Sequence, residues 1–338
     1  MKISDLPIYP YIQLEAFGWD DIKDLPGAKE GDIWEFEELA CKVVEGNFRN
    51  ACKNLWPFLE KIGIDSISIG IDIIGIGSGM AGYYHNSSDD GEGSYGFVIA
   101  SDALEDYLNY YLGGVRELKP MTKYMWEHEL IHLLDHKNIT ALKFANRSTD
   151  VREFLVHYLL SYRNEGIADL YYFLSNGPDI RNMETARKEF HDDVRRFSSV
   201  EWENYEIIKQ MELEMMQTCH FYSIGPWVIL HLLSCPEYKN HMPSVAEVIA
   251  RLHKGETIGN ETILKIIKST LQISNEDFVR YISEQGYGGA VFIGGNELSK
   301  LAERLNKITH PRIIHEDDRE YNKVNAAIVS FFDMIGGD

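Results

Sequence analysis

The chain has 338 residues, of which 44% are hydrophobic and 12% aromatic, enough to bury a substantial core in one large or two to three smaller structural units. Lys and Arg total 33 against 53 Asp and Glu, giving a formal net charge of −20. This charge repels nucleic acid and anionic membrane surfaces, so neither is expected as a partner. We expect the charge to serve solubility.

Residues 1–21 lack a basic segment followed by a continuous apolar run, so a cleaved secretion signal is not expected. No apolar run reaches the ~20 residues that cross a bilayer. The four cysteines are too few and too scattered for a disulfide framework, and none form a CxxC pair. We therefore expect a cytoplasmic protein with reduced thiols and without a cysteine-based zinc site.

The first 100 residues predict one long helical region and then a small mixed sheet. Apolar residues recur every three to four positions from Asp32 to Ile62, which is typical of an amphipathic helix. Alternation of apolar and small polar residues from Ser66 to Ile73 predicts a half-buried strand. Two further strands are predicted at Met80–His85 and Tyr95–Ala100, and the intervening segment NSSDDGEGS has the composition of a turn.

After Pro120 the pattern is helical to the end of the chain, with short turn signals between amphipathic segments. The predicted class is α+β. We expect an N-terminal helical segment at 1–62, a catalytic domain at 63–235 that holds the sheet, and a helical C-terminal domain at 236–338.

The segment MTKYMWEHELIHLLDH contains the pattern HExxH, with His128, Glu129 and His132 at its defining positions. On a helix, residues four apart differ by about 40° in direction and about 6 Å in height, so both imidazoles project from one face and can bind one ion. Glu129 lies about 100° around the helix, where it can reach a metal-bound water. A catalytic zinc site needs a third protein ligand, which this pattern does not supply.

Nearby candidates for that third ligand fail. The metzincin continuation requires Gly and His where this chain has Asp135 and Asn138. His136 lies about 12 Å along the helix from His128 and cannot share an ion with it. The next predicted helix offers Glu165 in the segment NEGIADL, with Asp169 one turn further on. Glu165 can bind the metal while Asp169 accepts the second ring N–H of a ligand histidine.

These motifs resemble the gluzincins, the zinc peptidases that include thermolysin and the large aminopeptidases, in which a Glu on a following helix completes HExxH. NEGIAD is similar to their NExxxD and NEGxA signatures, and the resemblance covers about residues 120–175. The spacing departs from the usual one, since 32 residues separate His132 from Glu165. The resemblance implies a zincin-like core and a Zn²⁺ ion bound by His128, His132 and Glu165, with Asp169 behind them.

The expected activity is hydrolysis of peptide bonds in a peptide or protein substrate. Zinc would activate a water and polarise the carbonyl, while Glu129 takes the water proton as general base. The segment HFYSIGP carries a Tyr-x-x-Gly pattern similar to one in the aminopeptidase branch, where a tyrosine assists the transition state. We assign that role to Tyr222, with His220 as the alternative.

Zinc peptidases of this kind commonly bind an extended peptide along a strand edge, and Met80, Ala81 and Gly82 are the predicted contacts. An endopeptidase is favoured over an aminopeptidase, because the chain has no GxMEN-like motif to hold a substrate's free amine. Two alternatives remain: a zinc-binding regulatory protein on a zincin scaffold, and an effector-type protease with a single protein substrate. The sequence carries no signal for an oligomeric state.

Overall fold

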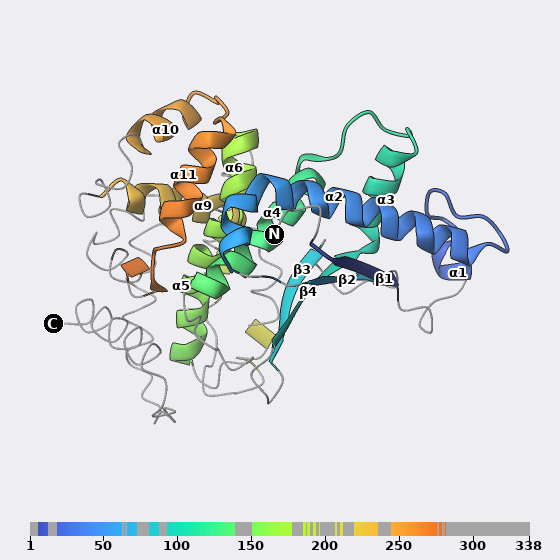
Figure 1. The fold of residues 1–338 in the computed structure, drawn as a ribbon. Helices are drawn as coiled ribbons and strands as arrows, with labels where there is room; N and C mark the ends of the chain where they lie inside the picture. The colour runs from blue at the N-terminus through green and yellow to red at the C-terminus, as the bar shows by residue number, and fades with distance from the viewer. Residues whose placement is uncertain are drawn as a thin grey trace. The chain divides into compact units, whose positions relative to one another are not determined.

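The computed structural model describes residues 6–12, 19–62, 64, 66–72, 81–87, 93–138, 151–177, 220–235 and 245–275, and single residues within 185–211 and 277–281. The chain divides into two compact units, Met1–Lys137 and Asn138–Asp338. Figure 1 shows the elements of both units as a ribbon. The three-part division expected from the sequence stays a prediction.

The first unit combines a small sheet with helices. Its elements in chain order are β1 (Ile8–Ile12), α1 (Trp19–Ile22), α2 (Ile33–Ile62), β2 (Ile67–Asp72), β3 (Ala81–Ser87), β4 (Gly93–Ala100), α3 (Ser101–Tyr111) and α4 (Pro120–Asn138). The long helix, three of the strands and the helix that carries HExxH all lie where the sequence pattern predicts them.

The sheet is mixed and has the strand order β1-β2-β4-β3. Strands β1 and β4 run parallel to β2, and β3 runs antiparallel to β4 with Ala81 opposite Ile99. Together with the helices, this arrangement confirms the predicted α+β class and the small mixed sheet. Because β3 is the last strand in the order, one of its two edges has no strand partner within the described ranges.

Strand β1 is not among the predicted strands. Its sequence IYPYI is short and holds Pro10, which lacks an N–H for a ladder hydrogen bond and therefore weakens the strand pattern. Proline is tolerated in edge strands, and β1 lies at the other end of the strand order from β3. The position of β1 in the sheet thus explains both the proline and the failure of the prediction.

The core of the first unit lies between α2, the sheet and α4. The alternation in β2 buries Ile67, Ile69 and Ile71, as its period of two predicts. Phe48 of α2 contacts Phe97 of β4 and Trp126 of α4, with ring centroids 4.9 and 5.0 Å apart in edge-to-face geometry. Edge-to-face pairs add about 0.5–1.5 kcal/mol each to the burial of their area. This cluster fixes α4 to the rest of its unit.

The described part of the second unit is helical. It contains α5 (Val151–Ala168), α6 (Leu170–Asn176), α9 (His220–Leu233), α10 (Val245–Leu252) and α11 (Asn260–Thr270). Helix α5 packs along α9, and α6 packs on α11 (Figure 1). Most side chains of α9 are buried, as its apolar sequence predicts for a helix covered on several sides.

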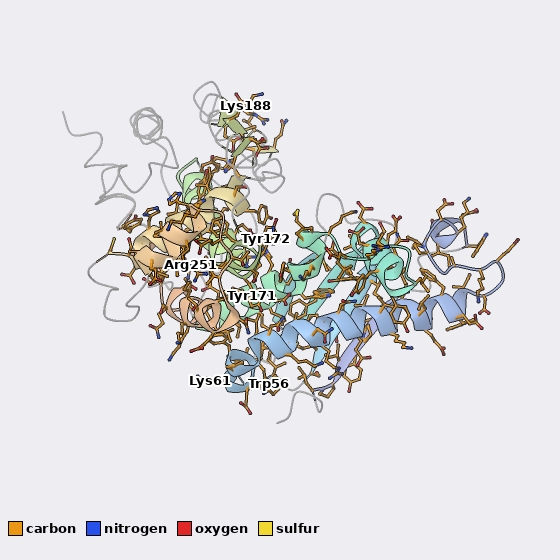
Figure 2. All side chains as sticks on the ribbon, turned by 90° about the horizontal axis from the view of Figure 1, so that it is seen from above. Trp56, Lys61, Tyr171, Tyr172, Lys188 and Arg251 are labelled. Atoms are coloured by element: carbon orange, nitrogen blue, oxygen red, sulfur yellow. The ribbon has the colours of Figure 1, made fainter. Side chains whose placement is uncertain are left out.

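Helices α10 and α11 coincide with amphipathic segments predicted in the C-terminal part of the chain. The segment that leads into α11 is hydrogen-bonded to α6, since the Ile258 N–H donates to the Leu174 carbonyl at 2.8 Å. Tyr171 of α6, labelled in Figure 2, also donates its hydroxyl to Asn260 Oδ1 at 2.8 Å. None of the helices in the described ranges is both long and apolar enough to traverse a lipid bilayer.

Candidate metal centre

Helix α4 carries HExxH and is held in its unit by polar contacts as well as by Trp126. Near its start, Thr122 donates its hydroxyl to Asp106 Oδ2 at 2.8 Å, and its carbonyl accepts the Tyr107 hydroxyl at 2.8 Å. One residue before the motif, Glu127 Oε1 accepts a hydrogen bond from Asn54 Nδ2 at 2.7 Å. These contacts with α2 and α3 fix the rotation of α4 about its axis, and therefore the direction in which its histidines project.

Glu127 is only 3% exposed. Burial raises its pKa to about 7, although the hydrogen bond from Asn54 acts in the opposite direction. A buried polar side chain is stable only when it is hydrogen-bonded, so Asn54 and Glu127 form a specific link between α2 and α4.

His128 and His132 lie on one face of α4, as their spacing predicts. Their Nε2 atoms are 3.1 Å apart, and their rings meet at 82° with centroids 4.7 Å apart. Two nitrogens bound to one tetrahedral zinc at the usual Zn–N length of about 2.0–2.1 Å would be roughly 3.3 Å apart. The two Nε2 atoms are thus already close to the separation that a shared ion requires.

Glu129 follows His128 and is 8% exposed. The next two residues, Leu130 and Ile131, are fully buried in the core. Leu130 and Ile131 thus face the core, whereas His128 and His132 project from the half-buried side of α4. The role of Glu129 as general base stays a prediction.

Glu165 lies in the last turn of α5, and its side chain is half-buried. The Asp169 N–H donates to the Glu165 carbonyl at 2.9 Å, and the Asp169 carbonyl accepts the Phe173 N–H at 2.9 Å. Helical hydrogen bonding thus continues from α5 into α6 through Asp169. Glu165 and Asp169 are one turn apart, and the contact predicted between Asp169 and a ligand histidine stays a prediction.

His128 and His132 of the first unit and Glu165 of the second are two imidazoles and a carboxylate, a group of side chains that could hold a metal ion. All three side chains are neither fully buried nor fully exposed. Two imidazoles and a carboxylate are the ligand set of catalytic zinc in several hydrolases. The donor set of the described residues therefore fits zinc.

The helix of Glu165 crosses α9 where two glycines meet. A Cβ added to Gly166 would lie 2.5 Å from the carbonyl carbon of Gly225, a distance that real Cβ atoms do not adopt. A Cβ added to Gly225 would lie 2.6 Å from the Gly166 Cα and from the Tyr162 carbonyl oxygen. The two helices can approach this closely only because both positions are glycine.

His220 and Tyr222, near the start of α9, lie in different environments. His220 is 0% exposed, with Nδ1 2.9 Å from the Tyr162 hydroxyl and Nε2 2.9 Å from Asp193 Oδ2. Its ring also stacks on Tyr162 with centroids 5.4 Å apart. Tyr222 is 36% exposed. Tyr222 is thus the more accessible residue of the two, and the buried imidazole of His220 is engaged by groups of its own unit.

Two of the three predicted substrate contacts lie in the described part of β3. Ala81 and Gly82 are half-buried and pair with Ile99 and Val98 of β4. A Cβ on Gly82 would lie 3.3 Å from Val98 Cγ1, so the glycine also relieves crowding within the sheet. Met80 and the side chain of His136 lie outside the described residues.

Two residues beside the predicted site were not predicted. Arg163, two residues before Glu165, is 1% exposed and donates to the carbonyl of Ile273. Asp193 accepts hydrogen bonds from the network around His220. The partners lie far apart in sequence, and no local periodicity signals such contacts. The sequence signals Arg163 only as a charged residue directly before the NEGIAD segment.

Comparison of the chain with protein-family models, with curated proteins and with solved structures gives no match.

Proposed function

We propose that this chain is a zinc metallopeptidase with a zincin-like core, in which His128, His132 and Glu165 bind the metal. The observation that carries the proposal is the close approach of the two HExxH imidazoles on α4, whose Nε2 atoms are 3.1 Å apart. Glu165 supplies the carboxylate that completes the candidate ligand set. Three protein ligands leave a fourth position for water, which distinguishes a catalytic zinc site from a structural one.

When bound, zinc would lower the pKa of a water molecule and polarise the carbonyl of the scissile bond. The chain supplies the groups that move protons. The Glu129 carboxylate accepts a proton from the attacking water and delivers it to the nitrogen of the leaving amine. A purely structural site has no use for such a base, so the presence of Glu129 favours the enzyme over a regulatory protein with the same scaffold.

Negative charge develops on the carbonyl oxygen during attack, and a hydrogen-bond donor stabilises it. We assign this role to the Tyr222 hydroxyl, because Tyr222 is partly exposed and His220 is fully buried. His220 then acts as a packing and hydrogen-bonding residue that holds the start of α9 on α5 through Tyr162.

The substrate would bind as an extended strand along β3, in contact with Ala81 and Gly82. Strand addition needs an edge strand, and β3 occupies an end of the described strand order. An interior position in a peptide suits this mode, so an endopeptidase is the form of the activity that we favour.

Zinc content and cleavage of casein or a peptide library test the proposal for the wild type and for Glu129→Gln. We expect both proteins to bind zinc, and we expect the substitution to remove cleavage because the base is lost. Glu105→Gln on α3 is the matched control, since Glu105 is exposed and lies outside the motif. If both the wild type and Glu129→Gln bind zinc and neither cleaves a substrate, the proposed peptidase activity is wrong. That result would favour the zinc-binding regulatory protein.

A further inference from the structure

Arg163 places a permanent positive charge inside the second unit, two residues before Glu165. Its side chain is 1% exposed. The guanidinium Nε donates to the Ile273 carbonyl at 3.1 Å, Nη2 donates to the same oxygen, and Nη1 donates to Asn164 Oδ1 at 3.0 Å. Such burial is costly unless the charge is hydrogen-bonded, so these bonds are specific and strong ones.

The carbonyl that Arg163 binds lies just beyond the end of α11. Helical hydrogen bonding there ends with Leu271 N–H to the Ile267 carbonyl, and the Ile273 N–H closes a turn on Thr270. A backbone carbonyl that lies beyond the end of a helix has no partner in the helical ladder and, when buried, needs another donor. A buried guanidinium at this position therefore satisfies a backbone acceptor at the end of α11.

The segment that contains Ile273 is itself docked on the helix that follows Glu165. Ile258 and Asn260 are bound to α6 through Leu174 and Tyr171, each at 2.8 Å. Arg163 adds a contact with α5, so residues 258–273 hold both helices that flank Asp169. Removing these guanidinium hydrogen bonds would free the last turns of α5, which carry Glu165.

We propose that Arg163 is a positioning residue for Glu165, and that the segment 258–273 acts as a brace for the metal-binding carboxylate. This inference rests on the proposed zinc site. It assigns residues of the predicted C-terminal domain to the support of the catalytic site. A metal ligand held by packing and by outer hydrogen bonds binds more tightly than one that must be ordered first, and loss of an outer partner typically costs about 10- to 100-fold in metal affinity.

The test compares Arg163→Lys and Arg163→Gln with the wild type in the full chain. Lysine keeps the charge but loses the planar fork that binds one carbonyl through two N–H groups. Arg251→Lys is the matched control, because Arg251 on α10 also donates to a backbone carbonyl, that of Thr257 at 2.9 Å, but at a partly exposed position (Figure 2). The readouts are zinc affinity by chelator competition, the absorption spectrum of the Co²⁺-loaded protein, and hydrogen exchange of α5.

We expect Arg163→Lys to weaken zinc binding by about 10-fold or more, to change the Co²⁺ spectrum even at saturation, and to speed exchange at the end of α5. We expect Arg251→Lys to match the wild type in all three. A variant at Arg163 that exchanges faster but keeps the wild-type zinc affinity and Co²⁺ spectrum overturns the inference, because Arg163 would then stabilise the fold without positioning the ligand.

Failure of the proposed function gives a different result. If the wild type binds neither Zn²⁺ nor Co²⁺, both the proposed zinc site and the positioning of Glu165 by Arg163 are wrong. Hydrogen exchange still reports whether Arg163 stabilises α5. Should neither Arg163 variant fold, Asn164→Ala decides by the same readouts, because it removes only the acceptor of Nη1.

Discussion

Gly166 and Gly225 bring the backbones of α5 and α9 into direct contact, so that a Cβ on Gly225 would lie 2.6 Å from the Gly166 Cα. Gly166 follows the predicted ligand Glu165, and Gly225 lies three residues after Tyr222. The crossing point of the two helices is therefore set beside two predicted site residues. Any side chain at either glycine must push the helices apart.

Gly225→Ala should lower the free energy of unfolding by about 1–3 kcal/mol, because overpacking of a close contact forces a backbone shift. Gly46→Ala provides the matched control: Gly46 lies within α2 and no atom lies within 4 Å of its added Cβ. There the same change should raise stability by about 0.5–1 kcal/mol through helix propensity. Urea unfolding of both variants measures the change in the free energy of unfolding. The same change in Gly225→Ala as in Gly46→Ala would contradict the close crossing of α5 and α9.

His128→Ala and His132→Ala should each remove bound zinc from the protein after gel filtration, since each deletes one nitrogen ligand. His253→Ala should retain zinc, because His253 lies outside the candidate ligand set. His253 is exposed, and its ring stacks on that of Trp227 with centroids 4.8 Å apart. Zinc content by atomic absorption distinguishes these outcomes. Retention of zinc by both motif variants would refute the assignment of the ligands.

Tyr222→Phe should lower kcat by about 10²- to 10³-fold with little change in stability, as expected for loss of one donor to the developing oxyanion. Tyr110→Phe, at another exposed tyrosine, should leave the rate unchanged. Cleavage kinetics on one peptide substrate measure both variants. An unaltered rate in Tyr222→Phe would remove this residue from the mechanism.

His220→Ala should act on stability instead. Its removal takes away the partner of Tyr162 and of Asp193 inside the second unit. Leaving buried polar groups unsatisfied costs about 1–3 kcal/mol each, so the free energy of unfolding should fall by about that amount. Thermal unfolding checks this, and a stable variant with a large loss of kcat would instead favour His220 as the oxyanion donor.

His231 should make stability depend on pH. Burial lowers its pKa below the ordinary value of 6.5, and His253 lowers it further. The unfolded chain therefore takes up a proton at a higher pH than the folded one, so stability is complete above about pH 6.5 and falls as the pH drops toward the folded pKa. Unfolding at about pH 8 and about pH 5.5 should show a smaller fall for His231→Gln than for wild type. Equal falls would contradict the assignment to His231.

The long helix α2, three strands and the HExxH helix of the first unit follow from local sequence patterns, whereas β1 and several contacts near the candidate site do not. Alternation of Ile67, Ile69 and Ile71 predicts β2, and the spacing of His128 and His132 places both on one helix face. Strand β1 was not predicted, because its stability comes from pairing with β2 and not from its own sequence.

Contacts between distant residues are equally invisible to a local pattern. Arg163 and Ile273 are 110 residues apart, and nothing near Arg163 in sequence indicates its partner. Gly166 lies in the NEGIAD segment and Gly225 in the HFYSIGP segment, but the sequence does not show that the two glycines meet. Only the packing of α5 on α9 explains why both positions are glycine. Local patterns in the sequence thus indicate candidate ligands, whereas the contacts that hold the helices of those residues in place come only from the fold.

X-ray absorption at the zinc edge tests the central claim most directly. Wild-type protein equilibrated with zinc and freed of excess metal should contain a bound ion with imidazole nitrogens at about 2.0–2.1 Å and further oxygen ligands. His132→Ala prepared in the same way should give no signal from bound zinc, because the variant loses one nitrogen ligand. Absence of bound zinc in the wild type, or a shell of thiolate sulfur near ~2.3 Å, would contradict the proposed centre.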